Sequence, residues 1–252
     1  MKELDFLKRM VKEAYENCCD GNVVVSAKAA FDVVTNVDHA IERYFAKELE
    51  KEFPGDHLLG EEFSSDLGLS DRTWILDPID GTYNFSIGAC HFGVQAAFFD
   101  KGQLQASAIY FPVLNELYTA ERGKGAFCNG KKISVSSREP KDAIISFGDP
   151  SHLREGEADI EWKMMQSAFG SIARYRMYGA SCVDFSYLAS GKTEGTVLIT
   201  RNKWDLAPGL LLAKEAGAKL FALDGGEYDF SARGVIACNK KEIFDILTEN
   251  KG

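Results

Sequence analysis

The sequence predicts a mixed α/β fold, because helix and strand patterns are arranged differently in its two halves. The first half has α+β character: two amphipathic helical segments precede a series of short apolar segments separated by turn residues. From about Ser136, strand and helix patterns alternate, which predicts an α/β sheet with helices on its faces. The polar segment 134–141, which contains Pro140, predicts a boundary between subdomains 1–135 and 136–252.

In the first half, apolar residues recur at helical spacing over 3–19, which predicts the first helix. A second helix is expected to start at Asn36 or Asp38 and to end before Phe53. Between them, 23–32 is expected to be a loop that moves over the site and carries Lys28. Strands are predicted at 58–60, 73–76, 93–99, 104–111 and 116–120, the last three forming an antiparallel meander. The Asn129-Gly130 pair predicts a tight hairpin between 126–128 and 131–135.

In the second half, strands and helices are expected to alternate as far as the end of the chain. Strands are predicted at 144–147, 173–178, 194–199 and 235–239, and helices at 160–169, 183–189, 206–216 and 240–248.

Composition indicates a soluble enzyme, since 252 residues with 45% apolar content suffice for a large core. The net charge of −9 argues against nucleic-acid binding, and the absence of a long apolar run argues against a membrane span. The charged N-terminus does not resemble a signal peptide, so a cytoplasmic location is expected. The six cysteines lack zinc-type spacing and are interpreted as structural thiols.

The most informative segment is Asp77-Pro78-Ile79-Asp80-Gly81-Thr82, which follows an apolar run. Because proline cannot donate to a sheet ladder, the strand is expected to end at this segment. Two carboxylates and a backbone carbonyl are hard oxygen ligands suited to Mg²⁺, and the Gly-Thr amides suit a phosphate oxygen. By itself the segment is equally compatible with a capped β-turn. Further acidic residues favour a single acidic site: Glu61-Glu62 follow another predicted strand, and Asp205 lies at an apparent helix start.

Taken together, these motifs resemble the inositol monophosphatase family, within the Mg²⁺-dependent, lithium-sensitive phosphatases that include fructose-1,6-bisphosphatases. The resemblance rests on WILDPIDGTYNF at 74–85 and on WDLAPG at 204–209 followed by EAG at 215–217. It extends to 32–38, 59–62 and GAFCNGKKIS at 125–134. It implies a layered α-β-α-β-α sandwich of two subdomains, with the active site in a cleft between two sheets. It also implies a homodimer.

The resemblance further implies two or three Mg²⁺ ions, with Mn²⁺ as a substitute. Glu61, Asp77 and the Ile79 carbonyl would hold the first ion, and Asp77, Asp80 and Asp205 the second. Thr82 would position the attacking water together with Asp38 or Glu61, although an aspartate at a helix start is usually a cap. The phosphate is expected at Asp80, Gly81 and Thr82. The substrate pocket is expected to include Gly179, Ala180 and Ser181.

Substrate choice is predicted from a departure from the family pattern. Seven positions before Asp205, where inositol phosphatases typically carry an acidic residue that contacts inositol, this chain has Leu198. Four cations near the pocket would suit a second phosphate; they are Arg174, Arg176, Arg201 and Lys203. The alternative interpretation is a solvated basic rim.

The expected activity is therefore hydrolysis of small-molecule phosphate esters, with fructose-1,6-bisphosphatase and inositol-1-phosphatase in one site, as in archaeal dual-activity members of the family. Two alternatives stay open: a 3′-phosphoadenosine-5′-phosphate phosphatase, and a metal-dependent binding or regulatory protein without catalysis.

Overall fold

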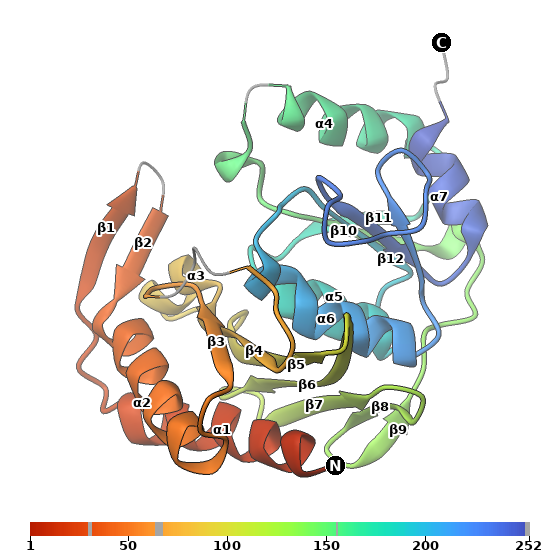
Figure 1. Ribbon diagram of the computed structural model, residues 1–252. Helices are drawn as coiled ribbons and strands as arrows, with labels where there is room; N and C mark the ends of the chain where they lie inside the picture. Colours follow the sequence, from red (N-terminus) through yellow and green to blue (C-terminus); the bar gives the residue numbers. More distant parts are fainter. Residues whose placement is uncertain (30–31, 64–67, 155, 250–252) are drawn as a thin grey trace.

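The computed structural model describes residues 1–29, 32–63, 68–154 and 156–249, and its secondary structure forms five layers. Helices α1 and α2 cover the outer face of a seven-stranded sheet, while α5 and α6 lie between that sheet and a five-stranded one (Figure 1). Helices α4 and α7 cover the outer face of the five-stranded sheet. The predicted α-β-α-β-α sandwich is confirmed.

The helices are α1 Lys2–Cys18, α2 Asn36–Glu52, α3 Thr82–Ser86, α4 Glu157–Ala168, α5 Ser181–Ala189, α6 Lys203–Glu215 and α7 Lys241–Thr248, with 3-10 turns at Pro140–Asp142 and Pro150–His152. The strands are β1 Val25–Ala29, β2 Asp32–Thr35, β3 His57–Gly60, β4 Thr73–Asp80, β5 Gly93–Asp100, β6 Gln103–Phe111, β7 Glu116–Glu121, β8 Gly125–Cys128, β9 Lys131–Ile133, β10 Ile144–Phe147, β11 Arg174–Met177, β12 Gly195–Leu198, β13 Lys219–Ala222 and β14 Val235–Cys238.

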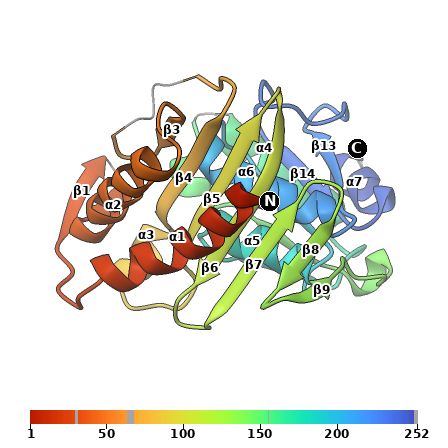
Figure 2. The ribbon, with the colours of Figure 1, turned by 60° about the horizontal axis from the view of Figure 1, so that its bottom comes forward.

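The seven-stranded sheet has the order β3-β4-β5-β6-β7-β8-β9, and from β4 onward each strand is antiparallel to the next, as the meander predicted (Figure 2). Strand β3 pairs with β4 in parallel. The five-stranded sheet has the order β11-β10-β12-β14-β13; β10 is parallel to β11 and β12, whereas β14 is antiparallel to both of its neighbours. Asn129 and Gly130 both have positive φ and form the predicted hairpin turn.

Three expectations about the strands are wrong. Strand β4 does not end at Asp77-Pro78 but continues to Asp80. The register between β4 and β5 shifts between the pairs Asp77↔Gln95 and Asp80↔Gly93, and Pro78 lies at this shift. Regular sheet hydrogen bonding is interrupted there, so the N–H that proline lacks is not needed. The expected loop at 23–32 contains β1, which pairs with β2, and the final sheet gains an unpredicted strand, β13. All five residues of β1 are exposed, so no buried alternation marks the strand.

Three apolar clusters hold the layers together. One lies under α1 and α2, where Phe6 packs edge-on against the fully buried Trp74. Another lies under α4 and α7. The central cluster joins β4 to β8 with α5 and α6 and therefore includes residues from both sides of the predicted boundary at 135/136. The subdomain division stays a prediction, and the shared core fixes the ends of β4, α5 and α6 relative to one another.

Candidate active site

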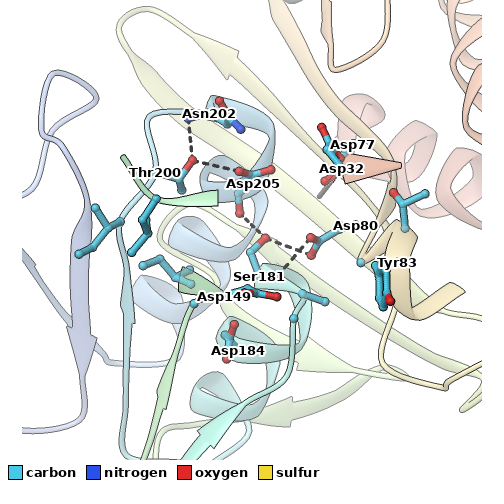
Figure 3. A pocket seen from close by; sticks show the side chains of 18 of the residues that line it. Asp32, Asp77, Asp80, Tyr83, Asp149, Ser181, Asp184, Thr200, Asn202 and Asp205 are labelled. Carbon is cyan, nitrogen blue, oxygen red and sulfur yellow. Dashed lines mark hydrogen bonds between the residues drawn. The ribbon is translucent and has the colours of Figure 1, made fainter. Parts of the chain in front are cut away.

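A cavity of about 390 Å³ opens where β4, α3, α5 and α6 meet the five-stranded sheet (Figure 3). Most of the predicted site residues line it, although they are far apart in the sequence. The predicted residues in its wall are Glu61, Asp77, Ile79, Asp80, Gly81, Thr82, Gly179, Ala180, Ser181, Arg201 and Asp205. The tertiary structure thus brings the three acidic segments to one place, as the sequence predicted.

Asp80 lies at the end of β4, and its carboxylate accepts hydrogen bonds from the start of α5. The backbone N–H of Ser181 donates to Oδ1 at 3.2 Å, and the backbone N–H of Cys182 donates to Oδ2. These amides belong to the first turn of α5 and have no partner within the helix, so Asp80 caps α5 from another part of the chain. The contact fixes α5 to the acidic end of β4.

Ser181 connects two predicted metal ligands. Its Oγ lies 3.0 Å from Oδ2 of Asp80 and 2.6 Å from the backbone oxygen of Asp205 (Figure 3). It also accepts a hydrogen bond from Nε2 of Gln95 at 3.1 Å. Gln95 Nε2 also lies 3.4 Å from Oδ2 of Asp77. Sequence reasoning assigned Ser181 only to the substrate pocket and missed Gln95. A glutamine within the apolar segment 93–99 was the available signal.

Glu61 follows β3 and forms an ion pair with a lysine from the β1–β2 hairpin. Lys28 Nζ lies 2.9 Å from Oε1 of Glu61 and 2.8 Å from Oε1 of Glu62. Lys28 thus contacts a predicted metal ligand, although it is exposed, does not line the cavity and is carried by a strand; its part in the site stays a prediction. Behind them, the buried Glu42 accepts the backbone N–H groups of Glu62 and Phe63 and so orders the segment after β3.

Thr82 and Asp38 lie next to each other at the predicted water-positioning place. Thr82 Oγ1 lies 2.8 Å from the carbonyl oxygen of Ile79 and 3.3 Å from Oδ1 of Asp38. Oδ2 of Asp38 accepts the backbone N–H of Thr35 in a capping box at the start of α2. The N-cap of α2 is therefore Thr35, with Asp38 as its capping-box partner in the first turn, and the other carboxylate oxygen of Asp38 faces Thr82.

Gly81 permits a close approach that a larger residue would prevent. Its φ is 85°, and an added Cβ would lie 2.8 Å from the carbonyl oxygen of His91 and 2.9 Å from Cβ of Ala180. Asn84, which sequence reasoning missed, donates through Nδ2 to the carbonyl oxygens of His91 and Tyr178 at 2.7 and 2.8 Å. These contacts hold α3 against the segment before β5 and against the loop that leads into α5.

Burial and mutual repulsion raise the pKa values of the clustered carboxyls. Burial, with the nearby Asp205 charge, raises the pKa of Glu61 to about 8, and burial beside Asp80 raises the pKa of Asp205 to about 7. Burial also raises the pKa of Asp38 to about 6 and that of Asp77 well above its usual range; Glu61, Asp80 and Asp205 add to the shift of Asp77. A cluster of this kind favours either protons or cations.

The donor set fits divalent cations. Asp77 is almost fully buried, and its Oδ1 has no hydrogen-bond partner among the described residues. Within the described ranges, no three acidic, histidine or cysteine side chains already surround a common point as metal ligands do. Lys28 holds Glu61, Ser181 and Cys182 hold Asp80, and Thr200 Oγ1 donates to Asp205 at 3.1 Å. The ligand roles stay predictions, and the unpartnered oxygen of Asp77 supports them.

The predicted basic residues are not gathered as expected. Arg201 lines the cavity, but Arg174, Arg176 and Lys203 do not. The guanidinium groups of Arg174 and Arg176 donate to carbonyl oxygens of their own strand, those of Ala173 and Tyr175. Strand β11 lies on the far side of β10 from β12, which carries these arginines away from the loop that contains Arg201.

Two arginines and two buried acids in the cavity wall were missed; they are Arg154, Arg233, Glu161 and Asp184. Asp184 interrupts the apolar run 182–189, which is a usable signal, and neither of its carboxylate oxygens has a partner among the described residues. Burial, with the Asp149 charge, raises the pKa of Glu161 to about 7. The arginines lie in loops, where no periodic pattern marks a residue that faces a cavity.

A model of the Inositol monophosphatase family matches residues 6–250. The chain belongs to the inositol monophosphatase family. Membership makes it a phosphatase that acts on phosphate monoesters.

Inositol monophosphatase relatives align over most of the chain. An inositol-1-monophosphatase of Rhizobium meliloti is 36% identical over 230 residues, covering 90% of this chain and 86% of the relative. A fructose-1,6-bisphosphatase/inositol-1-monophosphatase of Thermotoga maritima is 33% identical over 221 residues, covering 87% and 80%. The Nus factor SuhB of Pseudomonas aeruginosa is 35% identical over 230 residues, covering 89% and 84%.

Solved structures of inositol monophosphatase relatives share the fold. The extragenic suppressor protein suhB of Bartonella henselae superposes with a TM-score of 0.90 at 30% identity, over 99% of this chain and 100% of its own. An IMPase of Thermotoga maritima gives 0.88 at 30% identity, over 98% and 97%. An IMPase/NADP phosphatase complexed with Mg²⁺ and phosphate gives 0.80 at 30% identity, over 100% and 94%.

Proposed function

We propose that this phosphatase hydrolyses sugar and inositol phosphate monoesters in a Mg²⁺-dependent reaction, with fructose-1,6-bisphosphatase and inositol-1-phosphatase activity in one site. The observation that carries the proposal is the meeting of Glu61, Asp77, Asp80 and Asp205 in one cavity, with Oδ1 of Asp77 unpartnered among the described residues. The related IMPase/NADP phosphatase that is complexed with Mg²⁺ and phosphate supports the choice of ion.

Two or three divalent ions, with Mn²⁺ as a substitute, would be held by these side chains and by one carbonyl. Glu61, Asp77 and the Ile79 carbonyl would hold one, and Asp77, Asp80 and Asp205 another. When bound, the ions neutralise phosphate oxygens and lower the pKa of the attacking water. Because burial and mutual repulsion both disfavour the charged carboxylates and raise their pKa values, a bound cation would stabilise the deprotonated forms.

The chain's own residues would place the phosphate and move the proton. Gly81 and Thr82 line the cavity at the start of α3, where the first backbone N–H groups of a helix have no intrahelical partner and suit an anion. Thr82 Oγ1 lies within reach of both the Ile79 carbonyl and Asp38; when its proton points to Asp38, it would accept a hydrogen bond from a water and pass a proton on to that carboxylate. Asp38 lies 3.3 Å from that hydroxyl, and its pKa is raised to about 6. Of the two predicted partners, Asp38 and Glu61, Asp38 is therefore the better-placed proton acceptor.

The substrate assignment is supported by the Thermotoga maritima relative, whose name includes both activities, and by an arginine in the cavity wall. A homodimer, a cytoplasmic location and the absence of nucleic-acid binding stay predictions from sequence; light scattering of the purified chain would measure the first. Among the described residues, no helix is long and apolar enough to cross a membrane.

The test measures phosphate release from fructose 1,6-bisphosphate, inositol 1-phosphate and 3′-phosphoadenosine 5′-phosphate, with and without Mg²⁺. Asp80→Asn removes one anionic ligand and is expected to lower turnover by about 100-fold or more while the protein still folds. Asp159→Asn, an exposed change on α4 outside the cavity wall, is the matched control.

Each outcome decides between the candidates. Mg²⁺-dependent hydrolysis of the first two substrates, lost in Asp80→Asn but kept in Asp159→Asn, supports the proposal. Hydrolysis of the nucleotide alone would favour the 3′-phosphoadenosine-5′-phosphate phosphatase. Ligand binding without turnover of any ester would favour a metal-dependent regulatory protein.

A further inference from the structure

Three arginines in the cavity wall have guanidinium groups without a partner among the described residues. Arg154, Arg201 and Arg233 line the cavity, and none of these groups has a hydrogen bond or ion pair within the described part of the chain. Every other arginine side chain has a partner; these are Arg9, Arg43, Arg72, Arg122, Arg138, Arg174 and Arg176.

The sheet topology explains why the three come together. Strands β10 and β12 are parallel, so the segments after them, which carry Arg154 and Arg201, leave from the same edge of the sheet. Strand β14 is antiparallel to β12, so Arg233, which precedes it, lies at that edge too. Gly234 permits this approach, because an added Cβ would lie 2.5 Å from the carbonyl oxygen of Leu198.

Acidic side chains in the same cavity wall limit where an anion can bind: it must contact the arginines. Asp149, Glu157 and Glu161 also line the cavity, yet within the described residues none of them forms an ion pair with these arginines. Without the guanidinium groups, this wall would repel an anion. With them, it offers planar donors that match phosphate oxygens, and no existing ion pair has to be broken to use them.

We infer that Arg154, Arg201 and Arg233 form a subsite for a second phosphate group on the substrate. The arginines lie on the wall formed by the five-stranded sheet, whereas Gly81 and Thr82, where the scissile phosphate is placed, continue from the seven-stranded sheet. The inference rests on the proposed function, since it takes that placement of the scissile phosphate. It assigns the role that sequence reasoning gave to Arg174, Arg176 and Lys203 to different residues.

The experiment compares substrates that differ only in the second phosphate. One pair is fructose 1,6-bisphosphate and fructose 1-phosphate; the other is 3′-phosphoadenosine 5′-phosphate and adenosine 3′-phosphate. For each pair the ratio of kcat/KM is measured, together with the ratio of dissociation constants by calorimetry, so that affinity is known even where turnover is absent. The first pair tests a sugar bisphosphate and the second a nucleoside bisphosphate.

The preference for two phosphates is the ratio of kcat/KM for the bisphosphate to kcat/KM for the monophosphate. Arg201→Gln and Arg233→Gln are each expected to lower this ratio about 10-fold in at least one pair, and the double variant about 100-fold. Arg154→Gln is expected to act in the same direction. Arg43→Gln, which removes the same charge from α2 outside the cavity wall, controls for net charge and should keep the wild-type ratio. The ratio should also fall with rising salt concentration.

Three results would overturn the subsite: no two-phosphate preference in the wild type, an unchanged ratio in the Arg201→Gln/Arg233→Gln variant, or a ratio that falls in Arg174→Gln or Arg176→Gln instead. The proposed function fails separately, when neither inositol 1-phosphate nor fructose 1-phosphate is hydrolysed. Hydrolysis of those monophosphates without a preference for the bisphosphate would therefore refute the subsite alone.

Discussion

Replacing Ser181 by alanine tests whether one hydroxyl joins the two acidic segments of the site. The hydroxyl is buried and contacts Asp80 Oδ2 at 3.0 Å, the Asp205 backbone oxygen at 2.6 Å and Gln95 Nε2 at 3.1 Å. In Ser181→Ala, the glutamine N–H and the Asp205 carbonyl lose this partner, and Asp80 keeps only backbone donors.

The magnitude follows from the number and kind of bonds lost. A net hydrogen bond contributes about 0.5–1.5 kcal/mol, and one to a charged group about 1.5–3 kcal/mol. Since a single hydroxyl proton serves only one acceptor at a time, we expect Ser181→Ala to lower the free energy of unfolding by about 2–3 kcal/mol. For a chain of this size that corresponds to a fall in Tm of about 4–12 °C.

Ser186 on the same helix is the matched control. It is fully buried, and its Oγ has no hydrogen-bond partner among the described residues. Ser186→Ala should therefore change the free energy of unfolding by less than about 0.5 kcal/mol. The assay is urea unfolding followed by circular dichroism, with Tm measured in parallel. Equal effects of the two substitutions, or an unchanged stability of Ser181→Ala, would refute the reasoning.

Further predictions concern pH, helix packing and the loop before α5. The raised pKa values of Glu61 and Asp205, about 8 and about 7, mean that these groups bind protons more tightly in the folded chain, so their contribution to metal-free stability is lost as pH rises from about 4 to about 8. Mg²⁺ should therefore raise Tm more at pH 8 than at pH 6, and an equal shift at both would contradict this. In Gly209→Ala, the new Cβ would lie 2.1 Å from Cδ2 of Phe185, so α5 and α6 must separate at a cost of about 3 kcal/mol. Urea unfolding should show partial recovery in Gly209→Ala/Phe185→Leu, and no recovery would argue against this contact as the cause. Asn84→Ala breaks both bonds to the loop carbonyls and should cost about 1–3 kcal/mol; a Tm equal to that of the wild type would exclude this role.

Much of the fold was predictable because local patterns and tertiary packing agree. The apolar stripes of α1 and α2 pack on the sheet, and the Asn129-Gly130 turn forms where its chemistry requires positive φ. Strand β1 was not predictable, since all five of its residues are exposed and its order comes from contacts with other segments, namely pairing with β2 and the ion pairs of Lys28. The continuation of β4 past Pro78 depends on a register shift against β5, which the sequence of β4 alone does not contain.

The sequence by itself predicted the layered fold, through the resemblance of its motifs to a family, and it predicted the acidic residues that meet in the cavity, because each belongs to a local motif of the chain. Only the tertiary structure decided which side chains connect and surround those residues. Ser181 joins Asp80 to Asp205 because the shared core fixes the ends of β4, α5 and α6 together. Arg233 joins Arg201 in the cavity wall because β14 runs antiparallel to β12, and sheet order is set by packing between segments distant in sequence.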